Sequence, residues 1–387
     1  MSASDPATGT PYALFCDRWL PWYRRSLHEE IEAFKIFAPH IFPRVHHEDS
    51  PHWPTLHLLP KGAWTATSPS SLYSTLASIN PAILKQLRDL EPAFLHAMGG
   101  HTGLYASKYA SLVDRPLIVS LLGRDLTSWI RPDRYSPEAR AWQAGKEELI
   151  AATTSFIVSS GEMFELALEC RIPVEKLFRH RTGIQTRSYP FNMDYARLKP
   201  GVNDSLIVMK GRFLEEWGFR YGIKAFAHLC KSFPVRLAII GDGDLREELQ
   251  AQISDLHLQS RVTFIEPRSP REAAVLKQAS LALIPSVVGS DLQREFSSRF
   301  TMEAAALGIP IVATSHGANA DTVEDGVTGY LVPERDVDAL SDRAAFLLEE
   351  PLTSREFAAA GRAKIEFQFD VKKTSRTLEG FFKSVLA

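Results

Sequence analysis

The stretch LIVMKGRFLEEWGFRYGIKAFAHLCKSFPVRLAIIG, residues 206–241, holds two short apolar runs separated by a helical segment. Both runs are built from Val, Ile, Leu, Met and Ala without strict alternation, which is typical of strands in parallel sheets covered on both faces. The segment between them, residues 220–233, has apolar residues at helical spacing. A strand, a helix and a second strand in this order predict a βαβ unit.

The same alternation continues along the chain. Further strand-like runs are residues 116–123, 155–160, 262–266, 281–286 and 309–315, and further helical patterns are residues 244–257 and 270–280. A chain of 387 residues is too long for one ordinary core. The sequence therefore predicts an α/β protein with two Rossmann-like, doubly wound domains.

The domain boundary is expected where periodicity lapses and Gly, Pro, Asn and Asp accumulate, in residues 181–205. We place an N-terminal domain at residues 1–191 and a C-terminal domain at residues 192–365. A final helix, residues 366–387, is expected to cross back to the first domain. Ligands of such sheets bind beyond the carboxyl ends of the strands, so two domains that face each other would place the ligands in a cleft.

Composition excludes several classes of protein. The formal net charge is -2, with 45% hydrophobic and 23% charged residues, so net charge implies neither nucleic acid nor an anionic membrane as partner. The three cysteines form no Cys-x-x-Cys motif, which makes disulfides and cysteine-rich metal sites unexpected. Because no apolar run reaches the roughly 18 residues of a membrane span, we expect a soluble, cytoplasmic protein.

Two clusters near the N-terminus each allow two interpretations. The aromatic and basic cluster fits a peripheral contact with the inner face of a membrane or packing on the sheet, and the acids that follow favour packing. The histidine cluster suggests a metal or a Pro-rich loop, and its spacing favours the loop. The first cluster is Trp19, Trp22, Tyr23, Arg24 and Arg25, and the second is His46, His47, His52 and His57.

Two strand ends carry glycines that suit a ligand-binding loop. Gly211 and Arg212 follow the first run, where Gly permits a tight turn and Arg offers a fork of donors to a phosphate. Gly241 and Gly243 follow the second run, and Asp244 is placed to cap the next helix. A surface pair of Arg212 with a nearby Glu remains an alternative.

Glu295 and Glu303 stand eight positions apart in REFSSRFTMEAAALGIPIVATS, residues 294–315. On one continuous helix they would lie about 12 Å apart along the axis, too far to meet one small ligand. We therefore expect Glu295 in a loop, a helix start near Ser297 or Ser298, and Glu303 about one turn inside. The amides of Phe296, Ser297, Ser298 and Arg299 would then favour a phosphate, while the two carboxylates accept hydroxyls. This combination fits a nucleotide sugar.

The order of these motifs, with AAALGIPIVAT and DGVTGYLVP after them, resembles retaining glycosyltransferase family 4, the group 1 transferases of GT-B fold. The similarity runs from about Ser205 to Leu348, with weaker echoes in FLHAMGGHTGLYASKYA and GIQTRSYPF. RRSLHEEIEAF resembles exopolysaccharide-building members of the family. The resemblance implies a hexosyltransferase of polysaccharide biosynthesis. Such an enzyme moves a sugar from a donor such as a UDP-sugar to an acceptor hydroxyl, on a glycan, a lipid-linked molecule or a small molecule. It does so with retention, by front-face attack, without metal or cofactor.

The resemblance also assigns roles to residues. Glu303 would bind the ribose hydroxyls, Glu295 the hydroxyls of the sugar, and Arg212 the diphosphate. Gly211, Gly241, Gly243 and the amides after Glu295 would complete the donor site. On the acceptor side the candidates are His96, Arg124 and Asp125, and Asp125 would join Glu295 and Arg212 in catalysis.

The chain departs from the family pattern at several polar positions. Trp217 stands where the family has a diphosphate-binding Lys, and Lys210 or Arg294 is a candidate substitute. Leu122, Met98 and Gln185 replace a His, a second His and an Asp. These departures support an alternative, a GT-B protein that binds a nucleotide sugar without transferring it.

Overall fold

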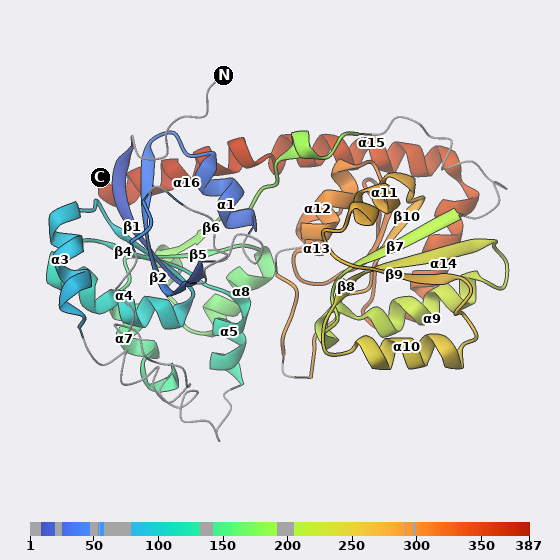
Figure 1. Ribbon diagram of the computed structural model, residues 1–387, viewed down its shortest axis with the longest axis horizontal. Helices are drawn as coiled ribbons and strands as arrows, with labels where there is room; N and C mark the ends of the chain where they lie inside the picture. The colour runs from blue at the N-terminus through green and yellow to red at the C-terminus, as the bar shows by residue number, and fades with distance from the viewer. Residues whose placement is uncertain are drawn as a thin grey trace. The chain divides into compact units, whose positions relative to one another are not determined.

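The computed structural model describes residues 9–19, 25–46, 53, 55–57, 79–131, 142–191, 205–290, 292–296 and 299–387. The chain forms two compact units, which are drawn in Figure 1. The first unit comprises Met1–Gly183 and Val371–Ala387, and the second comprises Ile184–Asp370. Each unit contains one six-stranded sheet in which the paired strands are parallel, so the predicted α/β architecture is confirmed.

The sheet of the first unit has the order β2-β1-β3-β4-β5-β6. From β1 the chain adds β2 on one side and β3 to β6 on the other side. The boundary between β1 and β3 is therefore the switch point at which doubly wound sheets bind ligands. The strands are β1 (Thr10–Trp19), β2 (Phe37–His46), β3 (Leu95–Met98), β4 (Leu117–Ser120), β5 (Ser155–Val158) and β6 (Leu177–Arg179).

Strand β2 contains two prolines, which a central strand would not tolerate because proline lacks an N–H. It pairs with β1 on one side, and on the other side the Ile41 N–H donates to the carbonyl of Thr55 at 2.9 Å. Pro39 and Pro43 lie two positions on either side of Ile41 and therefore share its orientation. Their missing N–H groups fall on the side away from β1, so the β1–β2 ladder is intact.

Helices cover both faces of the first sheet. On one face the apolar sides of α1 and α16 pack on β1, where the ring of Phe382 lies 5.7 Å from that of Tyr12. On the other face Phe15 of β1 contacts Tyr105 and Tyr109 of α4. The helices are α1 (Arg25–Glu32), α3 (Pro81–Leu90), α4 (Gly100–Val113), α5 (Gly123–Ile130), α7 (Lys146–Ala152), α8 (Gly161–Glu169), the 3-10 turn η1 (Val174–Lys176) and α16 (Val371–Leu386).

The sheet of the second unit has the order β9-β8-β7-β10-β11-β12. Counted from β7, this is the 3-2-1-4-5-6 order of dinucleotide-binding folds, with its switch point between β7 and β10. The strands are β7 (Ser205–Arg212), β8 (Val235–Asp242), β9 (Val262–Ile265), β10 (Leu281–Ile284), β11 (Ile311–Thr314) and β12 (Tyr330–Val332).

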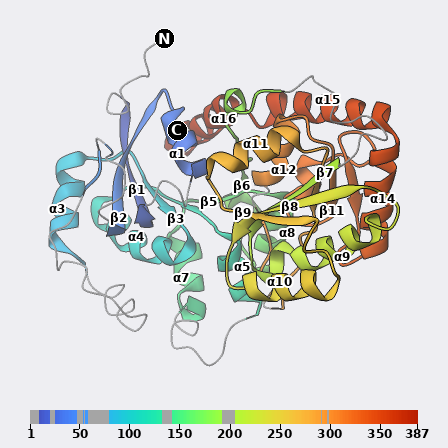
Figure 2. The ribbon, with the colours of Figure 1, turned by 45° about the vertical axis from the view of Figure 1, so that its right-hand side comes forward.

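Successive residues of β7 enter two different cores. Ile207 and Met209 pack with α9, α10 and α14, whereas Leu206 and Val208 pack with α11, α12 and α15. Figures 1 and 2 show these helix sets on opposite faces of the sheet. Burial of both faces explains the continuous apolar runs. The helices are α9 (Phe219–Leu229), α10 (Arg246–Asp255), α11 (Pro270–Gln278), α12 (Arg299–Ala306), α13 (Asn319–Thr322), α14 (Val337–Glu349) and α15 (Pro351–Gln368), with 3-10 turns η2 (Thr186–Ser188) and η4 (Glu215–Trp217).

The chain passes between the units at residues 183/184 and 370/371, a few residues from the sequence-based boundaries at 191/192 and 365/366. Ile184 donates its N–H to the carbonyl of Phe369 at 2.9 Å, and both side chains are buried in the core of the second unit. The two crossings are thus hydrogen-bonded to each other. Val371–Ala387 returns to the first unit, where the Glu379 carboxylate accepts the backbone N–H groups of residues 35, 36 and 37.

Across the described ranges, no helix combines the length and the apolar character that crossing a bilayer requires.

Candidate functional site

The candidate site of the second unit lies at the carboxyl ends of β7 and β10, on either side of the switch point. Strand β7 ends at Arg212, and β10 is followed by a loop that carries Glu295 before α12 begins. As the spacing predicts, Glu295 lies in the loop and Glu303 lies one turn inside α12. Both glutamates are buried, with 6% and 2% of their surface exposed. Both carboxylates therefore lie in the interior of the second unit, at the edge of the sheet where the strands have their carboxyl ends.

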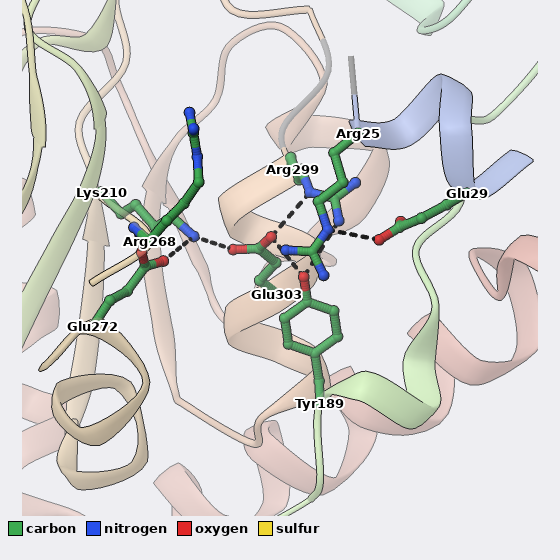
Figure 3. Close-up of polar contacts among 8 residues, drawn as sticks. All are labelled: Arg25, Glu29, Tyr189, Lys210, Arg268, Glu272, Arg299 and Glu303. Carbon is green, nitrogen blue, oxygen red and sulfur yellow. Dashed lines mark hydrogen bonds and ion pairs between the residues drawn. The ribbon is translucent and has the colours of Figure 1, made fainter. Parts of the chain in front are cut away.

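Glu303 is the centre of a polar network, which Figure 3 shows. Its Oε1 accepts a hydrogen bond from the Tyr189 hydroxyl at 2.7 Å and one from Arg299 Nε at 2.9 Å. Its Oε2 accepts from Lys210 Nζ at 2.5 Å. The same ammonium group contacts Glu272 Oε1 at 2.7 Å. A carboxylate expected to meet a ligand is thus also a structural junction between β7, α11 and α12.

The charges of this network stabilise one another. Burial raises the pKa of the Glu303 carboxyl, but the charges of Lys210 and Arg299, with hydrogen bonds from Lys210 and Tyr189, outweigh burial and hold that pKa below its ordinary value. Burial lowers the pKa of Lys210, but Glu303 and Glu272 raise it above its ordinary value. At neutral pH both groups are therefore ionised, as a buried charge requires when it is paired.

Glu295 is held by the loops around it. Ser286, two residues after β10, donates its hydroxyl to Glu295 Oε2 at 3.3 Å, and the Ser286 carbonyl accepts the hydroxyl of Thr314 at 2.5 Å. The Glu295 carbonyl accepts the N–H of Ala318 at 3.5 Å. The loops after β10 and β11 thus fix Glu295. Sequence reasoning did not find Ser286 or Thr314, because neither belongs to a pattern with a characteristic spacing.

Two further acids tie neighbouring loops to the loop after β10. Glu215 of η4 accepts both the N–H of Ser290 at 2.9 Å and its hydroxyl at 2.7 Å. Glu334, after β12, accepts the N–H of Val288 at 2.8 Å and lies 3.0 Å from Nδ1 of the buried His316. These contacts connect the carboxyl ends of β7, β10, β11 and β12.

Packing, and not a tight turn, explains why the residue at position 211 is a glycine. It lies inside β7, and a Cβ there would fall 1.9 Å from Cε3 of the Trp217 ring. Trp217, at the position where the resemblance predicts a lysine, therefore covers the β7 backbone at Gly211. The expected tight turn at Gly211 is wrong, because the strand continues to Arg212.

The contact between Gly211 and Trp217 predicts a strong coupling between two substitutions. Gly211→Ala is expected to destabilise the chain because its Cβ would overlap the Trp217 ring. In a Trp217→Ala background the same change should be tolerated, so a double-mutant cycle in urea should give a coupling energy of about 1–3 kcal/mol. An equal cost of Gly211→Ala in both backgrounds would contradict the packing explanation.

Gly241 in β8 and Gly243 directly after this strand are also needed, because the backbone of Gly211 and Phe213 approaches them closely. A Cβ on Gly241 would lie 2.0 Å from the Gly211 carbonyl oxygen, and Gly243 has φ +148° with the Phe213 backbone 2.9 Å from its would-be Cβ. Asp242 pairs with Arg246 Nε at 2.9 Å. The expected cap by Asp244 is wrong, because α10 begins only at Arg246 and its N-cap position is Leu245.

The other expected donor-site residues differ in exposure. The Arg212 side chain is 59% exposed, with its guanidinium 4.0 Å from Glu216, so it is open to a ligand. Phe296 is buried, and the Arg299 side chain points to Glu303. Ser297 and Ser298 lie outside the described residues. Of the candidate substitutes for the missing lysine, Lys210 is engaged with two carboxylates and Arg294 is half-buried in the loop.

In the first unit, Asp125 links two helix starts near the switch point. Its Oδ2 accepts the N–H of Leu122 and the N–H of Gly100, each at 2.8 Å. This carboxylate therefore fixes the loops after β3 and β4. Arg124, beside it, is exposed.

His96 lies in the core of the first unit. Its Nε2 lies 2.8 Å from the Ser120 hydroxyl, and its ring packs near Tyr12 and Phe382. Burial, with a smaller contribution from His180, lowers the pKa of His96 to about 3, so the ring is neutral at neutral pH. Only 3% of His96 is exposed, which places it away from solvent.

Within the described part of the chain, no three His, Cys, Asp or Glu side chains are grouped as metal ligands. Of the histidine cluster, His57 lies 2.9 Å from His40 and stacks on Phe42 with ring centroids 4.5 Å apart. His47 and His52 lie outside the described residues, as do Trp22, Tyr23 and Arg24 of the aromatic and basic cluster.

Comparison with known proteins relates the second unit to a family. Residues 195–364 match the family model of glycosyl transferases group 1. The chain is 29% identical over 216 residues to the putative colanic acid biosynthesis glycosyltransferase WcaL of Salmonella typhimurium, covering 55% of this chain and 52% of that protein. It is 29% identical over 208 residues to the amylovoran biosynthesis glycosyltransferase AmsK of Erwinia amylovora, covering 53% and 49%. The chain thus spans about half the length of these curated relatives.

Solved structures share the fold over nearly the whole chain. HepE of Anabaena, solved in complex with UDP, is 17% identical with a TM-score of 0.72, covering 97% of this chain and 100% of that chain. Sucrose-phosphate synthase of Thermosynechococcus elongatus is 19% identical with a TM-score of 0.78, covering 97% and 99%. At these identities the likeness shows the fold alone. Residues 195–364 therefore match the glycosyl transferases group 1, and the two α/β units of the chain have the GT-B fold.

Proposed function

We propose that the chain is a retaining glycosyltransferase that moves a sugar from a nucleotide-sugar donor to an acceptor hydroxyl. The observation that carries the proposal is the pair of buried carboxylates, Glu295 and Glu303, at the switch point of the second unit. Both lie in the segment that matches the group 1 transferases. Support for the donor class comes from HepE, whose structures include complexes with UDP and with UDP-glucose. The names of the matched relatives support a role in polysaccharide biosynthesis.

In this proposal Glu303 binds the ribose, Glu295 binds the transferred sugar, and Arg212 stabilises the departing diphosphate. An exposed guanidinium at the end of β7 can turn toward the developing charge. Each well-placed donor of this kind contributes a few kcal/mol to transition-state stabilisation. Arg212 and backbone N–H groups take the role that a metal has in other transferases, so the proposed reaction needs neither metal nor cofactor.

The acceptor would attack the face that the diphosphate leaves, and the leaving phosphate would take the proton of the acceptor hydroxyl. Retention of configuration follows from this front-face course. Arg124, exposed near the switch point of the first unit, is our candidate contact for the acceptor, and Asp125 fixes the loop that carries it. Cytoplasmic placement and contact with the inner face of a membrane stay predictions.

A nucleotide-sugar-binding protein without transferase activity is the second candidate, and Trp217 is the observation that favours it. Its ring covers Gly211 where the family has a cation. Lys210 does not replace that cation freely, since two carboxylates already neutralise it. Leaving-group stabilisation then depends on Arg212 and on Arg294, the remaining candidate substitute for the lysine.

Release of nucleoside diphosphate separates the two candidates. Purified protein incubated with UDP-, GDP- and ADP-sugars should release the diphosphate from at least one donor. Glu295→Ala and Arg212→Ala should each slow release by about 10²-fold or more, because each removes a group that acts on the reacting part of the donor. Nucleotide binding without release from any donor would support the binding protein. Undiminished release by Arg212→Ala would exclude its proposed role.

A further inference from the structure

Glu303 and Lys210 each retain one unused hydrogen-bonding position in the network. A carboxylate offers about four acceptor positions, and an ammonium group has three N–H donors. The contacts of Glu303 fill two positions on Oε1 and one on Oε2. Lys210 uses one donor on Glu272 and one on Glu303. One acceptor position on Glu303 Oε2 and one N–H on Lys210 therefore remain, on atoms that are 2.5 Å apart.

Lys210 is the more accessible member of this pair. Its side chain is 23% exposed, whereas that of Glu303 is 3% exposed. A ligand that approaches Glu303 Oε2 therefore does so beside the lysine ammonium. Lys210 stands directly before Gly211 near the carboxyl end of β7, at the switch point where such sheets bind ligands.

The charge balance of the network does not favour an anion. Lys210 and Arg299 carry two positive charges, and Glu272 and Glu303 carry two negative charges at contact distance. Glu272 is fixed in turn, because its other oxygen accepts the N–H of Arg268. A neutral group that both donates and accepts a hydrogen bond suits this pair best, and a hydroxyl is such a group.

We propose that Lys210 and Glu303 together recognise one ribose hydroxyl of the nucleotide, which donates to Glu303 Oε2 and accepts from Lys210 Nζ. The inference rests on the proposed function and names a residue that sequence analysis offered as a substitute cation for the diphosphate. In this assignment Lys210 determines the preference for ribonucleotides over deoxyribonucleotides. Glu272 is a positioning residue that holds the ammonium group in place.

The test compares ribonucleotides with their deoxy forms. Binding of UDP, GDP and ADP, and of the 2′-deoxy and 3′-deoxy form of each nucleotide that binds, is measured by calorimetry. The variant is Lys210→Met with Glu272→Gln, which removes one charge of each sign and leaves Glu303 with Arg299 and Tyr189. The control is Lys85→Met with Asp89→Asn, an exposed ion pair of α3 at 2.5 Å. Circular dichroism melting checks that each variant is folded.

The wild-type protein should prefer the ribonucleotide to one of its deoxy forms by at least about tenfold, and the Lys210 variant should lose about tenfold of that preference, because a hydrogen bond to a charged group is lost. Its affinity for that deoxy form should stay nearly unchanged, as should both affinities of the control. An unchanged preference overturns the inference, and equal weakening of both forms assigns Lys210 to the phosphates instead. If the wild-type protein binds no nucleotide, the proposed function fails as well.

Discussion

Replacing Glu303 with alanine is expected to lower the free energy of unfolding of the second unit by about 3 kcal/mol, because it leaves two cations without their shared carboxylate. Lys210 and Arg299 contact Glu303 at 2.5 and 2.9 Å, and their side chains are 23% and 20% exposed. Their partial exposure places the cost at the lower end of the range for a broken buried pair. Hydrogen exchange of β7 and β10 peptides in urea measures the second unit separately from the first.

The matched control is Glu366→Ala in α15. Glu366 also pairs with an arginine four residues before it, Arg362, at 2.7 Å, but its side chain is 53% exposed. Loss of an exposed pair should cost no more than about 1 kcal/mol. A cost for Glu303→Ala as small as that of the control would contradict the view that the network stabilises the unit.

The stability difference between wild-type protein and Glu303→Ala should also depend on pH. The neighbouring charges hold the pKa of Glu303 below its ordinary value of 4.5 in the folded chain. The wild-type protein therefore has its full advantage above about pH 4.5 and loses it as the pH falls through the folded-state pKa. Unfolding measured from pH 7 down to pH 3 should show the two curves converge. A gap that stays constant would mean that the ionised carboxylate is not its source.

Gly241→Ala should destabilise the second unit by about 2–3 kcal/mol or more. Its new Cβ would lie 2.0 Å from the carbonyl oxygen of Gly211, which is backbone and cannot rotate away. Gly241 and Gly211 are register partners, so relief of the overlap has to separate the ends of β7 and β8. Because Arg212 follows Gly211, the same variant should also weaken nucleotide binding in the calorimetric assay.

Gly361→Ala provides the control for this substitution in the same unit. Gly361 lies within α15, and the nearest atom to its added Cβ is 3.6 Å away, an ordinary contact. Alanine there should be neutral or stabilising by up to about 1 kcal/mol, because alanine favours a helix interior over glycine. If both variants lost the same stability, the close approach of β7 and β8 would not be the reason for glycine at position 241.

The sequence alone predicted most of the second unit. Strands β7, β8, β9, β10 and β11 coincide with the apolar runs, because parallel strands buried on both faces contain few polar residues. The positions of Glu295 in a loop and Glu303 inside α12 followed from helix geometry, since eight residues on one helix would separate the two side chains. Local spacing and periodicity carry this information.

The strands of the first unit were harder to predict from the sequence because they mix apolar and polar residues. Strands β1 and β2 include Asp17, Pro39, His40 and Pro43, which hide the expected periodicity. Their pairing depends on an edge position and on contacts of Ile41 with loop residues 55–57. Such contacts have no signature in a local window of sequence.

The partners of the site residues were decided only by the tertiary structure. Lys210 and Tyr189 reach Glu303 across 93 and 114 residues of chain, and no spacing rule connects them. The identity of Gly211 depends on where the Trp217 ring packs, and the two hydrogen bonds of Asp125 depend on the meeting of two helix starts. The sequence alone determined which residues could serve a nucleotide sugar, because residue type sets charge and hydrogen-bonding capacity. The tertiary structure decided which of those groups are already bonded to other residues of the protein, because such bonds depend on contacts between segments far apart in the chain.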